Sequence, residues 1–251
     1  MRFMRGWWGC DLGSHRQVAE LDDDTYGSLP LLPAHIFDGR FGWLTPQAAG
    51  ADAQYMEANP VPTAGLARID RRLARDGLAL PSSFVTFMGS ETLQRAVPHV
   101  ATCWEMSPTP VPSPVEKHAY LVRFMHDVQS CAYWYLYLGS DGSSPVVASI
   151  NLYEPTESEE DEDMSTADFL DQTVWLAPDF EHFVYRYWIE SVACCQADQS
   201  GVRWDDLRPE VREYLDHYRH TVRAQLDVWP SAFPAAALRN ADAMPGQAAL
   251  W

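Results

Sequence analysis

A succession of three β-rich apolar runs restricts the fold of this chain more than any other feature of the sequence. The runs cover residues 120–125, 131–138 and 146–152. Asp141 and Gly142 supply a turn pair between the second run and the third. Because consecutive strands joined by short turns run in opposite directions, the pattern predicts a three-stranded antiparallel meander.

The middle run carries large side chains on both of its faces. Side chains alternate along a strand, which places Tyr133, Tyr135 and Tyr137 on one face and Trp134, Leu136 and Leu138 on the other. A strand with two such faces is expected in the centre of a sheet, covered from both sides. Core packing is the expected role of the tyrosines, although tyrosine rows also form recognition surfaces. Cys131, at the start of the run, is expected to be a buried thiol.

Helical patterns lie on both sides of the meander. Before it, Thr63 is expected to cap a helix that Gly77 ends, and Pro81 begins a second, short helix. Their inward positions are Leu66, Ile69 and Leu73, followed by Phe84, Phe87 and Met88. After it, a short strand is expected around residues 173–176, followed by two helices beginning near Pro178 and Pro209. The first of these has an apolar stripe made of Phe180, Phe183, Val184, Tyr187 and Trp188. The predicted fold class is α+β, a central and mainly antiparallel sheet packed against several helices.

Proline content and charge divide the chain into three parts. Residues 1–62 combine tryptophans with prolines and predict an irregular N-terminal arm that docks on the main body. Residues 63–230 form the predicted α+β domain, with an acidic loop at 154–165, and residues 231–251 form a loosely held tail. Alternate prolines within residues 107–116 predict an extended connector.

The formal net charge is −17, with 35 acidic residues against 18 lysines and arginines. Such a charge repels nucleic-acid phosphates and anionic membranes and suits a basic protein partner, although acidic surfaces also serve solubility alone. The five cysteines lack the even count of a disulfide framework, and no apolar run approaches the ~20 residues of a membrane helix. A cytoplasmic protein is therefore expected.

The strongest local charge lies between the meander and the next strand. Its six carboxylates are Glu157, Glu159, Glu160, Asp161, Glu162 and Asp163. Such a run repels itself and predicts a solvated loop, which either binds a basic partner or only adds solubility. Tyr153, just before the loop, is the candidate aromatic anchor for a partner.

The order of these elements resembles the SUKH superfamily, which includes bacterial immunity proteins against contact-dependent and polymorphic toxins and the yeast cell-wall-synthesis regulator family. Three segments carry the resemblance: residues 80–87 (LPSSFVTF), 124–138 (FMHDVQSCAYWYLYL) and 180–190 (FEHFVYRYWIE). The segment at 124–138 is similar to the F-x-x-D-x-Q-x-C-x-x-W-Y-L-Y-L hairpin of large SUKH-like proteins. The resemblance covers roughly residues 63–220, on the predicted positions of the elements. It implies a binding scaffold without catalytic residues, in which Asp127 and Gln129 stabilise a turn.

No motif for catalysis or for a cofactor stands out in the sequence. Glu213, His217 and His220 fall on one side of the last helix and form the best metal candidate, but a solvated face is the more common meaning of such spacing. His126 beside Asp127 favours a turn contact over a catalytic pair. The sequence therefore predicts a non-catalytic protein without cofactors that binds another protein, as an immunity protein binds its toxin. An adaptor scaffold and a metal-dependent hydrolase are the alternatives.

Overall fold

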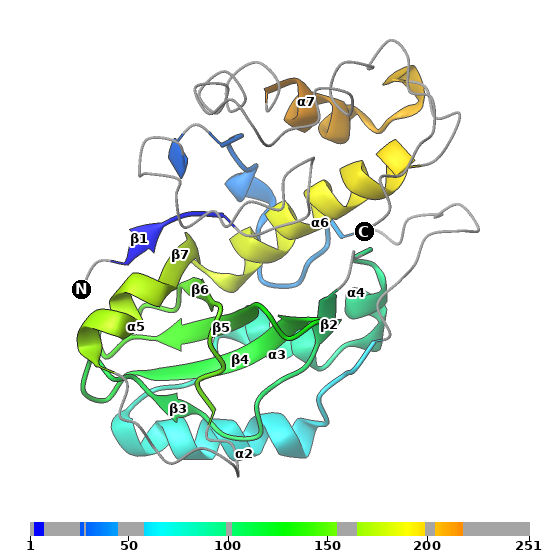
Figure 1. The fold of residues 1–251 in the computed structure, drawn as a ribbon. Coiled ribbons are helices and arrows are strands. Elements are labelled where there is room, and N and C mark those ends of the chain that lie inside the picture. The colour runs from blue at the N-terminus through cyan, green and yellow to red at the C-terminus, as the bar shows by residue number, and fades with distance from the viewer. Residues whose placement is uncertain are drawn as a thin grey trace.

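The computed structural model describes residues 3–7, 26–27, 29–44, 58–98, 102–154, 165–198 and 204–217. These residues form an α+β fold built on a seven-stranded sheet (Figure 1). The strands are β1 (Met4–Arg5), β2 (Thr102–Trp104), β3 (Val111–Pro112), β4 (Tyr120–Asp127), β5 (Tyr133–Leu138), β6 (Val146–Ser149) and β7 (Thr173–Ala177). Their order is β1-β7-β6-β5-β4-β2, and β3 also pairs with β4. All pairs are antiparallel except β1 with β7.

The predicted meander is confirmed as β4, β5 and β6, with Tyr135 opposite Arg123 on one side and Val147 on the other. The turn before β6 holds Gly142 at a φ of 85°, a left-handed conformation that glycine adopts without strain. β5 is central and buried on both faces, as predicted. Its position follows from the alternation of large side chains, because neither face can be left in water.

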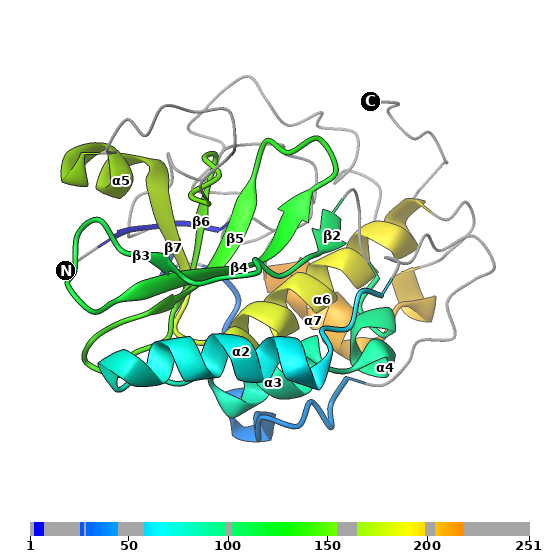
Figure 2. The same cartoon turned by 90° about the horizontal axis from the view of Figure 1, so that it is seen from below.

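The helices are α2 (Thr63–Leu73), α3 (Ser82–Met88), α4 (Glu91–Arg95), α5 (Thr166–Gln172), α6 (Phe180–Asp198) and α7 (Pro209–His217), with short 3-10 turns η2 (Ala34–Ile36), η3 (Ala74–Asp76) and η4 (Trp204–Asp206). α2, α3 and α6 lie on one side of the sheet, while α5 lies towards the other (Figure 2). Two cores result, one on each face. The main core joins those three helices to Trp134, Leu136 and Leu138, whereas the smaller tyrosine-face core joins Phe3 and Phe169 to Tyr135 and Tyr137.

Several local predictions are confirmed and one changes. Gly77 ends the first helical segment at a φ of 76°, and Pro81 precedes α3, whose Phe84, Phe87 and Met88 are fully buried. Thr63 was expected to cap α2, but it is the first helical residue, and Pro62 takes the cap position without a side-chain hydrogen bond. Proline fits there because its φ is already close to a helical value and it has no N–H to satisfy.

Cys131 was expected in a buried strand and is instead exposed. β5 begins only at Tyr133, because the preceding residues form the turn that follows β4. Within that turn Ser130 adopts a φ of 56°, and the Asp127 carboxylate accepts hydrogen bonds from the backbone of Cys131 and Ala132. The turn therefore keeps Cys131 out of the sheet.

The described parts of residues 1–62 belong to the fold. β1 extends the sheet next to β7, and Trp7, Leu29, Phe41 and Leu44 are buried in the main core. The sheet and the core therefore include residues on both sides of the predicted boundary at residue 62. Within the described residues, no helix combines the length and apolar character that crossing a membrane requires.

A buried polar network joins this arm to α6 and α7. Both Glu190 carboxylate oxygens are used, one accepting from the Tyr214 hydroxyl at 2.5 Å and the other from the Trp7 indole at 2.6 Å. Arg186 donates to the same hydroxyl at 3.1 Å and to the Pro30 carbonyl at 3.0 Å. Burial raises the pKa of Glu190 to about 7, although the hydrogen bonds from Tyr214 and Trp7 and the charge of Arg186 oppose it. Ionisation of the Glu190 carboxyl in the folded protein therefore lowers the stability of the fold.

Because of Glu190, the free energy of unfolding should fall as the pH rises from 5 to 8. A folded-state pKa of about 7 against 4.5 for the ordinary carboxyl means that the folded state holds the proton more tightly. The Glu190 contribution is therefore fully present below pH 4.5, is lost as the pH rises through 7, and amounts to about 3 kcal/mol. In urea titrations, Glu190→Gln should remove this slope, while Glu213→Gln, on an exposed carboxyl, should keep it. Equal pH slopes for the wild type and Glu190→Gln would contradict the assignment.

Candidate functional site

One end of the sheet combines exposed apolar side chains with carboxylates. We call it the hairpin-end surface and define it by Glu105, Asp127, Val128, Tyr133 and Ile150. These residues come together because β4 and β6 end next to the start of β5: His126 pairs with Tyr133, and Tyr133 pairs with Ser149. The turn after β4 and the residue after β6 therefore meet at the same edge.

The turn from Asp127 to Ala132 is held by a side chain. Asp127 accepts from the backbone N–H of Cys131 at 2.5 Å and of Ala132 at 2.9 Å. The backbone adds bonds from Ser130 N–H to Asp127 and from Asp127 N–H to Ala132, each at 3.0 Å. The predicted turn-stabilising role of Asp127 is therefore confirmed, and Gln129 lies exposed in the same turn. A turn fixed in this way presents Val128 in one conformation.

The apolar part of the surface consists of Val128 and Ile150, which are 55% and 47% exposed. Each follows the last residue of its strand, β4 for Val128 and β6 for Ile150. Since β5 lies between those strands, the two residues stand at the same end of the sheet, on either side of β5.

Ion pairs with Arg123 and His126 order Glu105 and Glu154. Arg123, whose side chain is only 10% exposed, donates from Nε to Glu154 at 2.6 Å and from Nη2 to Glu105 at 3.1 Å. Glu105 also contacts His126 Nε2 at 3.1 Å. Burial raises the pKa of Glu105, but the hydrogen bond and charge of Arg123 outweigh it, so the net shift is downward. Glu105 is therefore an ionised carboxylate whose side chain remains 49% exposed.

The predicted anchor, Tyr153, is partly buried beside this end of the sheet. Its hydroxyl is hydrogen-bonded to Ser149 and Thr173 at 2.7 Å each, and its ring packs on Tyr135 and Phe169. Its backbone N–H donates to the Tyr135 hydroxyl at 3.0 Å. Tyr153 thus fixes the chain after β6 to the tyrosine face, and its contact with a partner stays a prediction.

The other predicted partner-binding residues, Glu157, Glu159, Glu160, Asp161, Glu162 and Asp163, lie outside the described residues. The described residues on each side of them are well anchored. Glu154 pairs with Arg123, and its second carboxylate oxygen accepts from the Tyr135 hydroxyl at 3.3 Å. On the other side, Ser165 caps α5, and the Thr166 hydroxyl donates to the Pro114 carbonyl at 3.3 Å. Glu154, the last described residue before the acidic run, is therefore fixed to β4 and β5.

The metal candidate is only partly described. Glu213 and His217 lie on α7, while His220 falls outside the described residues. Among the residues that the structure describes, no group of three or more His, Cys, Asp or Glu side chains has the arrangement to hold a metal ion. The His126 ring contacts the Asp127 backbone carbonyl at 2.7 Å and Glu105, which is a structural pairing at the turn.

Sequence reasoning missed Val128, a single apolar residue between two predicted strands, and Ile150, which fell inside the predicted strand at residues 146–152. The one signal that could have identified them was the predicted turn role of Asp127, which ends β4 before Val128. No family model, curated protein or solved structure matches the chain. The relation to SUKH proteins therefore stays a prediction drawn from the sequence.

Proposed function

We propose that this protein is a non-catalytic binding module that neutralises a basic protein toxin, as an immunity protein does, and that the hairpin-end surface binds the toxin. One observation carries the proposal: Val128 and Ile150 are exposed where β4 and β6 end, and the ionised Glu105 is held beside β4 by Arg123 and His126. Apolar side chains within a polar rim are the usual anatomy of a protein interface.

The two kinds of side chain have different tasks in this proposal. Val128 and Ile150 lose water when the partner covers them, and such buried contacts set the dissociation rate. Glu105 and the six carboxylates of residues 157–163 attract a cationic partner, which raises association rates by ~10–10³ at low salt. A net charge of −17 adds to the same attraction.

Neutralisation by occlusion needs no chemistry from the protein. A toxin that acts on nucleic acid has a basic cleft for phosphate, and a carboxylate-rich surface competes for that cleft. The ordered turn at Asp127 and the fixed Glu154 lower the entropy cost of presenting the surface. The partner proposed is therefore a basic protein, bound across the hairpin-end surface and the acidic run.

The experiment uses the product of the open reading frame next to this gene, with binding kinetics measured at two salt concentrations. Val128→Asp combined with Ile150→Asp should weaken binding at least about 30-fold, mainly through faster dissociation, because two hot-spot contacts are lost. Replacing the six carboxylates with Ser or Asn should slow association about tenfold at low salt and flatten its salt dependence. Leu31→Asp is the matched control, since Leu31 is an apolar side chain that is 93% exposed elsewhere.

Two results would contradict the proposal. The first is equal weakening by Leu31→Asp and by the double variant, which would show that the hairpin-end surface has no special role. The second is a neighbouring gene product that neither binds the protein nor kills cells lacking it. That outcome would favour an adaptor scaffold over an immunity protein.

A further inference from the structure

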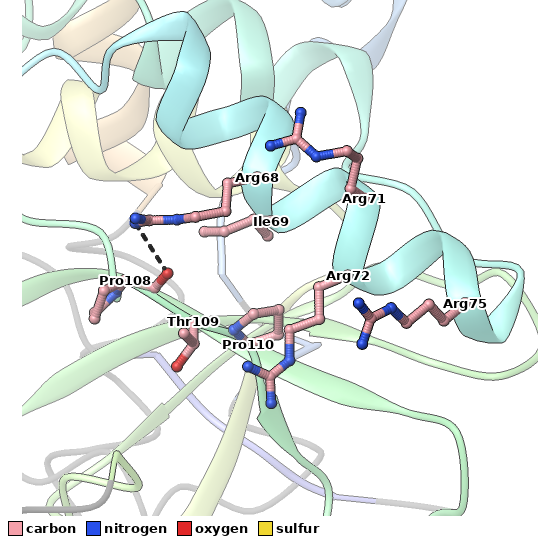
Figure 3. A pocket seen from close by; sticks show the side chains of 8 residues that line it. All are labelled: Arg68, Ile69, Arg71, Arg72, Arg75, Pro108, Thr109 and Pro110. Carbon is pink, nitrogen blue, oxygen red and sulfur yellow. Dashed lines mark hydrogen bonds between the residues drawn. The ribbon is translucent and has the colours of Figure 1, made fainter.

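A groove lined by arginines lies on α2, in contrast to the negative net charge of the chain. Arg68, Arg71, Arg72 and Arg75 fall at i, i+3, i+4 and i+7 and are all exposed. The loop from Pro108 to Pro110, between β2 and β3, forms the other wall, and the groove has a volume of about 480 Å³ (Figure 3). Four of the 18 cationic side chains of the chain thus gather within eight residues.

The groove has a defined shape because both walls are attached to the sheet. α2 buries Leu66, Ile69 and Leu73 in the main core, which turns its arginine face outward. Arg68 Nη2 donates to the Pro108 carbonyl at 3.2 Å and so connects the helix to the loop. In Figure 3, Arg68 and Arg72 extend towards the loop, whereas Arg71 points away from it. Arg68 and Arg72 are therefore the pair placed to hold a ligand.

The carboxylates of the same segment are already engaged. Asp70 accepts from the Leu80 backbone N–H at 2.7 Å. Asp76 is bonded to the His118 ring at 2.6 Å and to the Tyr120 hydroxyl at 2.5 Å. Within the described parts of the chain, none of the four guanidinium groups forms an ion pair. Like charges three and four residues apart on a helix repel, so a bound anion would relieve this repulsion.

We propose that the arginine groove binds a small molecule carrying a diphosphate or triphosphate group. Guanidinium groups bind phosphate oxygens in pairs, and two arginines one helical turn apart can hold two phosphates of one chain. The volume falls within the range of small-ligand sites. No aromatic ring is among the described residues that line the groove, so the phosphates themselves are recognised and not a stacked base. A net charge of −17 opposes long polyanions such as nucleic acid.

The site is independent of the proposed toxin-binding function. It is formed by α2, η3 and residues 108–110, and it shares no residue with the hairpin-end surface, although Glu105 of that surface lies earlier in the same β2–β3 connection. Failure of one proposal therefore leaves the other in place. The Thr109 side chain, which also lines the groove, has a hydroxyl that can donate to a phosphate oxygen.

Calorimetric titration of the full chain with inorganic tripolyphosphate tests the proposal. The wild type should bind one molecule, with an affinity that falls as salt is added. Arg68→Gln combined with Arg72→Gln should weaken binding about 100-fold, because two charge-assisted bidentate contacts are lost. Arg95→Gln is the matched control, since this exposed arginine lies on α4 and pairs with Glu91 at 2.8 Å, and it should bind as the wild type does. Arg72→Lys keeps the positive charge but loses the planar guanidinium group that binds two phosphate oxygens at once. It should weaken binding about three- to tenfold.

Three outcomes would overturn the proposal. In the first, tripolyphosphate binds neither the wild type nor a variant in which the six carboxylates of residues 157–163 are Asn or Gln. The groove would then have no phosphate ligand. Binding only in that neutralised variant would assign the groove to the acidic run of the chain itself. Tighter binding of duplex DNA than of tripolyphosphate, lost in the Arg68/Arg72 double variant, would replace the small ligand with a nucleic acid. Unchanged circular dichroism of the variants confirms that the comparison is between folded proteins.

Discussion

Replacing Arg186 with methionine is expected to lower the free energy of unfolding by about 3–5 kcal/mol. The side chain is 7% exposed and donates to the Tyr214 hydroxyl and the Pro30 carbonyl. Its guanidinium also lies over the Trp7 ring, 5.5 Å from the centroid. Methionine fills similar volume but removes the hydrogen bonds to Tyr214 and the buried Pro30 carbonyl, which is the main source of the loss. The loss of the positive charge near Glu190 adds to it.

Urea unfolding at pH 7.5 measures this loss directly. Arg40→Met is the control, because Arg40 is exposed, and it should change stability by less than about 0.5 kcal/mol. Adding Glu190→Gln to Arg186→Met should restore part of the loss, since the unpaired buried carboxylate is then removed. A loss for Arg186→Met no larger than that of Arg40→Met would show that the buried network contributes nothing.

Phe180→Ala is the second substitution with a large expected effect, a loss of about 3–5 kcal/mol. Phe180 is fully buried at the start of α6, and its ring lies 4.9 Å from Phe84, 5.5 Å from Phe87 and 5.0 Å from Phe124. It therefore joins α3, α6 and β4 at one point. Removing the ring leaves a cavity among rings that are held by α3 and β4, so the cavity can close only in part.

Thermal unfolding should show the Phe180→Ala loss as a fall in Tm of roughly 6–20 °C, given the size of the chain. Phe37→Ala makes the same chemical change at a partly exposed site in the arm, and should cost less than half as much. Equal falls in Tm for the two variants would mean that the centre of the aromatic core lies elsewhere.

The sequence predicted the centre of the sheet better than its edges. Alternation along residues 131–138 was enough to place β5 in the centre, because two large faces leave no other position. β1 could not be found in this way, since both of its residues are exposed and it is a strand only through pairing with β7. The short β2 gave no signal either, because three residues are too few to reveal a repeating pattern.

Burial of charge on α6 was equally hidden in the sequence. An apolar stripe predicted one buried face, yet Glu181, Arg186 and Glu190 are buried as well. Glu181 accepts from the Gly39 backbone N–H and the Trp43 indole, and those partners lie about 140 residues earlier in the chain. From the sequence alone, a charged residue is predicted to be exposed, because the distant groups that form hydrogen bonds with it in the core are not known. The exposure of Tyr153 in the candidate site could not be predicted for the same reason. It depends on Thr173, which is 20 residues later in the chain and binds the Tyr153 hydroxyl.

The pairing of β1 with β7 has a consequence for synthesis on the ribosome. Trp7, just after β1, hydrogen-bonds to Glu190, 183 residues later in the chain. At translation rates of ~5–20 residues per second, β1 waits roughly 10–40 s for its partners to be made. During this interval β1 and the Trp7 side chain have no partner and stay open to contacts with other chains. A chaperone that holds these residues until β7 and α6 are made would therefore protect the nascent chain from aggregation.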